Sequence, residues 1–197
     1  MGKLVVITNL TLDGVMQSPG RPDEDRRGGF GHGGWAAPFG AMEEAGGALA
    51  NIGALLLGRW TYESFRGFFP NQSDNPYTAF LTDIPKYVAS LTMTEAPAWA
   101  NTILLHGDAT AAVARLKAEL ERDLVVFGSG TLVRSLMGKA LVDDLVLLIH
   151  PLVLGTGRRL FLDNGWSAGF ALRDVTTTSR GVVVATYGPA GEQGPIS

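Results

Sequence analysis

The chain has 197 residues, of which 46% are apolar and 18% charged, a composition typical of one globular domain with a sizeable core. It contains no cysteine, which excludes disulfides, thiolate zinc sites and a cysteine nucleophile. The formal net charge is -3 and the basic residues are scattered among acidic ones, so the pattern argues against a nucleic-acid-binding protein.

The apolar segments do not predict a secreted or membrane protein. The amino-terminal run is broken by Thr8 and Asn9, whereas a signal peptide needs a longer uninterrupted stretch. The longest apolar run, residues 145–154, is interrupted by His150 and Pro151 and is too short to span a bilayer. We therefore expect a cytoplasmic protein that does not act at a membrane.

The first part of the chain predicts one strand and one long loop. Residues Lys3–Asn9 are β-branched and apolar, which predicts a strand buried on both faces. A turn signal, Thr11–Gly14, comes next. Residues 17–40 are rich in glycine, proline and charge but include aromatic residues such as Trp35. We expect this segment to be a functional loop that packs on another part of the protein.

Strands and helices alternate through the middle of the chain, and strands alone follow. Helices are predicted over residues 41–51, 61–67, 77–82, 110–122 and 131–139. Strands are predicted over residues 54–57, 86–90, 102–105, 124–127, 144–154, 170–178 and 182–187. The pattern predicts an α/β fold whose mainly parallel sheet has helices on both faces and ends in antiparallel strands. We expect one domain over residues 1–188 and a flexible tail over 189–197.

Two turns from a strand to a helix have the form of a ligand site. In the first, Gly58 lets the backbone approach a ligand, Arg59 can pair with a phosphate, and Thr61 can cap the following helix. The second is Gly128-Ser129-Gly130. A helix start favours anions, but either turn alone is also explained as an ordinary turn. Neither matches a Rossmann fingerprint or a P-loop.

Five segments in chain order resemble the dihydrofolate-reductase superfamily. The resemblance is closest to stand-alone proteins similar to the reductase domain of the bifunctional riboflavin-biosynthesis deaminase/reductase, and it extends from Lys3 to Tyr187. The segments are Thr11–Gly14, Gly58–Ser64, Lys86–Thr92, Phe127–Gly130, and the tail formed by Leu141–Leu145 with Pro151–Phe161. The resemblance implies a three-layer α/β/α fold.

The resemblance also implies an NADPH-dependent oxidoreductase. It would transfer hydride to a small heterocycle such as a pterin, a pyrimidine or a riboflavin precursor. The residues that would bind the cofactor are Gly58, Arg59, Trp60, Thr61, Ser90, Leu91, Thr92, Gly128, Ser129, Gly130, Thr131 and Leu132. Arg59 would favour NADPH over NADH. The related domains pair through their C-terminal strands, which implies a homodimer, and no metal site is expected.

Hydride transfer to such a ring also needs a proton. Asp13, just past the first strand, is one candidate catalytic acid, and a turn-forming role in its Asp-Gly pair is the alternative. Glu43 is the second candidate, with Glu44 beside it, and a solvated helix surface is the alternative there. His32 and Trp35 are candidates for substrate binding, although Trp35 can equally fill the core. For His150 we favour a hydrogen-bonded core histidine.

Departures from the resemblance limit what it implies. The residues after the first strand read Val15-Met-Gln-Ser-Pro19 instead of carrying a Pro-Trp pair, which argues against folate as the natural substrate. No zinc deaminase motif is present either. The uncertain proton donor leaves open a non-catalytic module that binds a nucleotide or a drug in the same pocket. A flavin-dependent protein is a third alternative.

Overall fold

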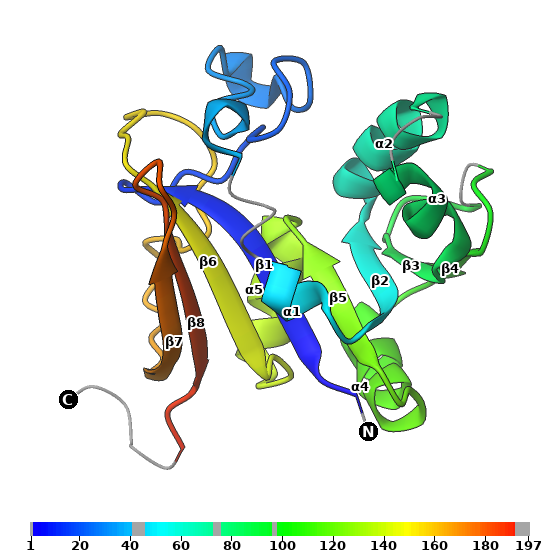
Figure 1. Cartoon of the computed structure of the whole chain (residues 1–197). Helices are drawn as coiled ribbons and strands as arrows, with labels where there is room; N and C mark the ends of the chain where they lie inside the picture. Colours follow the sequence, from blue (N-terminus) through cyan, green and yellow to red (C-terminus); the bar gives the residue numbers. More distant parts are fainter. Residues whose placement is uncertain (1, 41–45, 73–75, 96–97, 192–197) are drawn as a thin grey trace. The chain divides into compact units, whose positions relative to one another are not determined.

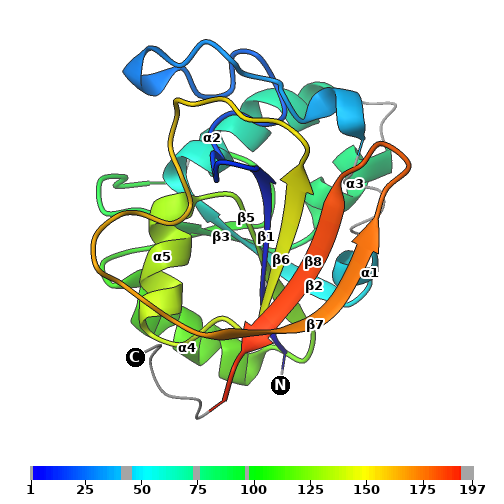
Figure 2. The ribbon, with the colours of Figure 1, turned by 90° about the vertical axis from the view of Figure 1, so that its left-hand side faces the viewer.

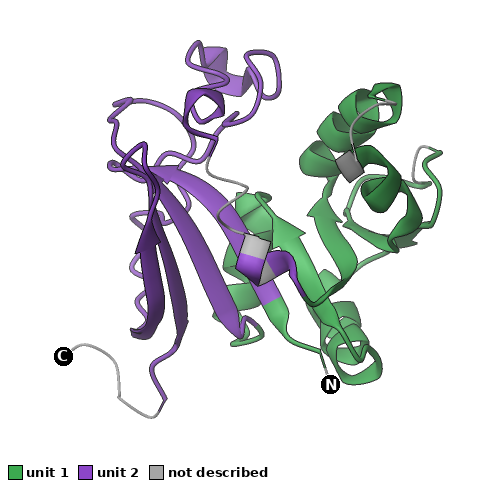
Figure 3. Ribbon diagram, in the orientation of Figure 1, with its two compact units in different colours: residues 1–4, 51–141 green, residues 5–50, 142–197 purple. Residues whose placement is uncertain are grey.

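The computed structural model describes residues 2–40, 46–72, 76–95 and 98–191. The chain divides into two compact units (Figure 3). Residues 1–4 and 51–141 form unit 1, and residues 5–50 and 142–197 form unit 2. Each unit draws on separated stretches of the sequence.

Unit 1 contains four parallel strands in the order β4-β3-β2-β5 (Figure 1). They are β2 (Ile52–Gly58), β3 (Lys86–Ala89), β4 (Thr102–Leu105) and β5 (Asp123–Phe127). Strands β2 and β5 are mostly apolar, and their residues Leu55, Leu56 and Val125 are fully buried. Such apolar sequences are typical of parallel strands covered on both faces.

The helices of unit 1 follow its strands along the chain. They are α2 (Arg59–Phe68), a 3-10 turn (Phe69–Asn71), α3 (Pro76–Asp83), α4 (Ala109–Glu119) and α5 (Gly130–Gly138). Helix α4 begins where the Asp108 carboxylate accepts a hydrogen bond from Thr110 N, 2.9 Å away. It ends earlier than the sequence predicts, because Leu120 has an extended backbone.

A buried lysine closes the carboxyl end of α3. Lys86 is fully buried, and its Nζ donates to the carbonyl oxygens of Leu81, Thr82 and Ile84 at 2.7, 3.0 and 2.8 Å. The ammonium also lies 4.7 Å from the ring centroid of Trp99. Burial lowers the pKa of Lys86 to about 8, and the nearby Asp83 opposes this shift. The lysine therefore stays protonated at neutral pH and can donate all three hydrogen bonds.

Unit 2 is built on strands in the order β1-β6-β8-β7, which run side by side in Figure 2. They are β1 (Leu4–Thr11, whose first residue belongs to unit 1), β6 (Asp144–His150), β7 (Phe170–Thr177) and β8 (Val183–Pro189). Strands β1 and β6 are parallel, whereas β8 is antiparallel to both β6 and β7. The antiparallel end predicted from the sequence is thus confirmed.

Two predicted elements of unit 2 differ from the structure. The strand predicted over residues 144–154 ends at His150, because Pro151 has no N–H and Leu152 N turns back to the His150 carbonyl at 2.8 Å. Of the helix predicted over residues 41–51, residues 41–45 lie outside the described structure. The described part forms only the short α1 (Gly46–Leu49). Two 3-10 turns, Arg27–Gly29 and Ala37–Phe39, interrupt the long loop.

Candidate functional site

Three adjacent strands of unit 1 bring all the predicted cofactor-binding segments to one edge. Because β3, β2 and β5 are parallel neighbours, their carboxyl ends lie at the same edge. Residues 58–61 form the end of β2 and the start of α2, residues 90–92 follow β3, and residues 128–132 follow β5. Neither α2 nor α5 has a side chain capping its amino terminus. Both helix starts therefore present backbone N–H groups that lack intrahelical partners.

Arg59 is held at this edge with most of its donors available. Its Nε donates to Glu63 Oε1 at 2.8 Å and its Nη1 to Thr92 Oγ1 at 2.9 Å. An arginine has five N–H donors, so three remain after these two bonds within the described parts of the chain. The guanidinium carbon also lies 5.6 Å from the ring centroid of Trp60, which is 53% exposed. This arrangement fixes a cation beside an exposed aromatic ring.

The segment after β3 forms a tight polar turn. Ser90 Oγ accepts from Thr92 N at 3.2 Å and from Met93 N at 3.1 Å. Leu91 and Thr92 are exposed at the surface of this turn. The contact of Thr92 with Arg59 joins it to the turn after β2.

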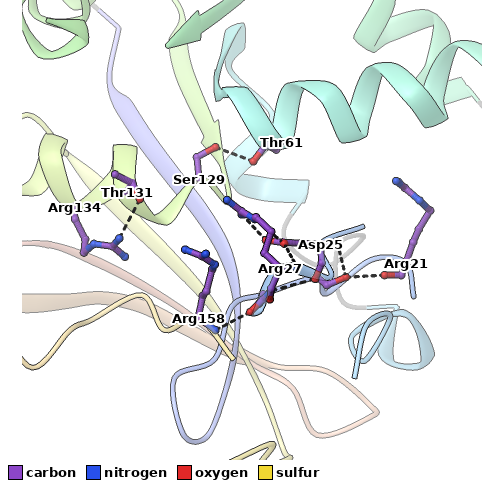
Figure 4. Close-up of polar contacts among 10 residues, drawn as sticks. Arg21, Asp25, Arg27, Thr61, Ser129, Thr131, Arg134 and Arg158 are labelled. Carbon is purple, nitrogen blue, oxygen red and sulfur yellow. Dashed lines mark hydrogen bonds and ion pairs between the residues drawn. The ribbon is translucent and has the colours of Figure 1, made fainter. Parts of the chain in front are cut away.

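The turn after β5 has an unusual backbone. Gly128 and Ser129 both adopt left-handed conformations, with φ values of 54° and 56°. The Ser129 hydroxyl reaches the neighbouring turn, where it lies 2.8 Å from Gly58 N and 2.8 Å from Thr61 Oγ1 (Figure 4). It also donates toward the Phe127 carbonyl at 3.2 Å. A single side chain therefore links the β2–α2 and β5–α5 turns.

The structure corrects one detail of the β2–α2 turn and adds another. Thr61 does not cap α2, because it lies inside the first turn of the helix and its hydroxyl bonds to Ser129 instead. A Cβ atom at Gly58 would lie 3.0 Å from Ser129 Oγ, so the small size of Gly58 makes room for that hydroxyl. At the start of α5, Thr131 is exposed and accepts a 3.2 Å hydrogen bond from Arg134, while Leu132 is half-buried.

In unit 2, Asp13 organises a turn. Its carboxylate accepts from Thr11 Oγ1 at 2.6 Å, from Gly155 N at 2.9 Å and from Leu154 N at 3.2 Å. Arg159 adds an ion pair at 3.4 Å. The Thr11 hydroxyl lowers the pKa of Asp13 to about 2, with further lowering by the two N–H groups against an opposing effect of burial. Asp13 is ionised near neutral pH, and this geometry supports its turn-forming role.

The loop over residues 17–40 is tied together by Gln17. The Gln17 amide nitrogen donates to Asp25 O at 3.1 Å and to Arg27 O at 2.9 Å, while its oxygen accepts from Arg158 N at 3.0 Å. Arg27 forms a two-bond ion pair with Asp25, which Figure 4 shows beside Arg158. Burial raises the pKa of Asp25, but the bonds from Arg27 outweigh it, and the net direction is down.

Trp35 is a buried aromatic residue of this loop. It is 8% exposed, its Nε1 donates to Gln17 O at 2.7 Å, and it clusters with Val15 and Phe30. This position agrees with the core-filling alternative. His32 is exposed, and its ring centroid is 5.8 Å from that of Phe30.

His150 is fully buried at the end of β6. Its Nε2 is 2.8 Å from Asn9 Oδ1, and the rings of Trp35 and Phe39 meet it edge-on at 5.1 and 5.0 Å. Its Nδ1 has no partner among the described residues. Burial lowers the pKa of His150 to about 4, so the ring is neutral at physiological pH. The predicted core histidine is thus confirmed by its burial and its hydrogen bond.

Two candidate residues lie outside the described structure. Glu43 and Glu44 belong to residues 41–45, which the structure does not describe. Among the residues that are described, no cluster of three or more His, Cys, Asp or Glu side chains could hold a metal ion. The described helices are all too short or too polar to cross a membrane.

Sequence reasoning missed the links between the segments. Ser129 was predicted to face the cofactor, but its left-handed backbone and its bond to Thr61 were not, because Gly-Ser-Gly reads simply as a flexible turn. Gln17 was not predicted at all. A lone glutamine in a polar loop has no sequence pattern that reveals its partners.

Comparisons with known proteins match almost the whole chain. The family model of the RibD C-terminal domain matches residues 3–184. The uncharacterized protein YyaP of Bacillus subtilis strain 168 is 29% identical over 143 residues, which cover 71% of this chain and 75% of that protein.

Solved structures share the fold at lower identity. A putative riboflavin biosynthesis protein from Shewanella sp. PV-4 has a TM-score of 0.67 and 23% identity, covering 95% of this chain and 98% of the other. Dihydrofolate reductase from Enterococcus faecalis, solved with NADP(H), has a TM-score of 0.61 and 15% identity. The match covers 96% of this chain and 97% of that one. Acinetobacter baumannii RibD, form 2, has a TM-score of 0.60 and 15% identity, and the match covers 96% of this chain but 58% of that one.

Proposed function

Because the chain belongs to the family of the RibD C-terminal domain, we propose that it is an NADPH-dependent reductase of a small heterocyclic substrate. The dihydrofolate-reductase-like α/β fold agrees with this proposal. The substrate class is a pterin, a pyrimidine or a riboflavin precursor. When bound, the cofactor would supply the hydride, and the protein would supply positioning and charge stabilisation.

The observation that carries the proposal is the cationic edge of unit 1. Two uncapped helix starts and the three remaining donors of Arg59 fit the phosphates of a dinucleotide. The exposed ring of Trp60 and the polar turn at Ser90–Thr92 fit its adenosine. These residues would bind and orient the cofactor.

The proposed reaction also needs a proton. Asp13 is a poor donor near neutral pH, because its pKa is lowered to about 2. Glu43 stays a candidate acid and His32 a candidate for substrate contact, whereas the buried position of Trp35 favours its core-filling alternative. A shift of the pH–rate profile in Glu43→Gln, with no such shift in Glu44→Gln, would support Glu43 as the donor.

Titration with NADPH and NADH, followed by tryptophan fluorescence, tests the cofactor proposal. We expect Arg59→Ala to weaken NADPH binding by roughly 10- to 100-fold, as the loss of charge-assisted hydrogen bonds predicts, with a smaller effect on NADH. Arg66→Ala on the same helix is the matched control, since Arg66 contacts Ala98 O instead of the edge. Failure of the unaltered protein to bind NADPH at millimolar concentration would refute the proposal.

A non-catalytic binding module is the second candidate. The ionised state of Asp13 favours it, because that carboxylate lacks a proton to give. Consumption of NADPH with any acceptor from a panel of pterins, pyrimidines and flavin precursors would exclude this candidate. Tight NADPH binding without turnover of any of them would support it.

A further inference from the structure

Ser129 has a backbone conformation that favours glycine. Its φ and ψ are 56° and 50°, a left-handed conformation that is strained for a residue with a Cβ. Its hydroxyl nevertheless contacts Gly58 N, Thr61 Oγ1 and Phe127 O. A strained backbone at a residue whose hydroxyl has three polar partners indicates that the hydroxyl has a specific function.

Counting donors and acceptors gives the Ser129 hydroxyl two possible arrangements. A hydroxyl has one proton and two lone pairs, and Gly58 N–H can only donate to it. The Ser129 proton therefore points either to Phe127 O at 3.2 Å or to Thr61 Oγ1 at 2.8 Å. In the first arrangement Thr61 must donate to Ser129. In the second Thr61 accepts from Ser129, and its own proton is free for a ligand.

A phosphate oxygen selects between these arrangements, because it only accepts hydrogen bonds. The bond that is given up, to Phe127 O, is the longest of the three, and the bond gained is charge-assisted. We propose that Ser129 is a positioning residue that turns its proton from Phe127 to Thr61 when a dinucleotide phosphate binds, so that Thr61 donates to that phosphate. This inference rests on the proposed function, which puts the cofactor phosphates at these two turns.

Ser129→Gly is the direct test, because glycine suits the left-handed backbone and lacks the hydroxyl. We expect its Kd for NADPH to rise about tenfold while its Tm stays at or above that of the unaltered protein. Ala140→Gly is the matched control, since Ala140 is also left-handed in unit 1, with φ of 52°, but follows the far end of α5. Its Kd should not change.

Thr61 variants provide an independent route that leaves residue 129 untouched. Thr61→Val should raise the Kd about as much as Ser129→Gly, and Thr61→Ser, which keeps the hydroxyl, should restore binding. If the two hydroxyls act as one relay, the double variant Thr61→Val/Ser129→Gly binds within about twofold of either single variant. Two independent contributions would instead multiply to about a hundredfold loss.

The outcomes separate this inference from the proposed function. An unchanged Kd in Ser129→Gly, or a multiplicative loss in the double variant, would overturn the relay while NADPH binding by the unaltered protein stands. Absence of NADPH binding by the unaltered protein would overturn the proposed function and the relay together. If Ser129→Gly lowers the Tm together with the affinity for NADPH, the hydroxyl is a purely structural link. That result would also overturn the relay.

Discussion

The Asp13 carboxylate gathers four donors from two separate segments of unit 2. Replacing it with asparagine puts an NH₂ group against the N–H groups of Leu154 and Gly155. We expect Asp13→Asn to lower the free energy of unfolding by about 1–2 kcal/mol at pH 7, measured by urea unfolding. Asp23→Asn is the control, because the Asp23 side chain is 69% exposed.

This prediction has a pH dependence of known sign. The pKa of Asp13 is lowered from 3.8 to about 2 in the folded protein. Its contribution is therefore complete above pH 3.8 and is lost as the pH falls from 3.8 toward 2. The difference between the unaltered protein and Asp13→Asn should shrink over that window. A difference that stays constant would contradict the role assigned to the carboxylate.

His150 predicts a second pH dependence, at milder acidity. Its pKa is lowered from 6.5 to about 4 by burial, so between these values the unfolded chain binds a proton that the folded protein does not. The free energy of unfolding should fall by roughly 3 kcal/mol from pH 6.5 to pH 4 on account of this residue. His150→Gln should flatten that dependence, whereas replacing the exposed His106 with glutamine should not. An equal slope in both variants would contradict the prediction.

At the scale of elements, Lys86 on β3 stabilises the carboxyl end of the preceding helix, α3. Lys86→Met removes the donor to three carbonyl oxygens at the helix end, and we expect a loss of about 1–3 kcal/mol in the free energy of unfolding. Amide exchange in α3 should accelerate most. Lys139→Met, at an exposed position after α5, is the control. Unchanged exchange in α3 would show that the ammonium does not hold the helix end.

The element pattern was largely predictable from the sequence. Strand β4 was predicted with its observed bounds, and β2, β3 and α2 within a few residues, because uninterrupted apolar runs and helical periods report burial directly. The end of β6 was predicted wrongly. Its apolar run continues past Pro151, and only the missing N–H of that proline stops the strand.

The candidate site was predictable as a set of segments but not as a set of contacts. Glycines after strands indicate where the turns are, so residues 58–61 and 128–132 could be named. The contact between Ser129 and Thr61 spans 68 positions of the sequence. No local pattern encodes such a pairing, and the left-handed backbone that aims the hydroxyl is a property of the folded turn.

At the scale of the whole molecule, the predicted homodimer can be tested through β7. This strand ends the order β1-β6-β8-β7, and it exposes Leu172 and Val175 at 55% and 49%. Exposed edge strands with apolar side chains favour pairing with another chain. We expect light scattering on the unaltered protein to give twice the chain mass of 20.9 kDa.

Leu172→Asp should shift this dimer to the monomer. Ile103→Asp on β4, the strand at the end of the order in unit 1, changes a residue of similar exposure, 51%, and should leave the dimer intact. If only Ile103→Asp dissociates the dimer, the dimer forms through β4 and the prediction for β7 is wrong. A monomeric unaltered protein would refute the dimer.

The three hydrogen bonds of Gln17 have a consequence for the kinetics of any molecule that docks on the 17–40 loop. The loop loses its conformational entropy when the chain folds, so a molecule that binds there does not have to order it. Association there should not wait for a slow rearrangement, so the observed rate should rise linearly with ligand concentration and show no plateau.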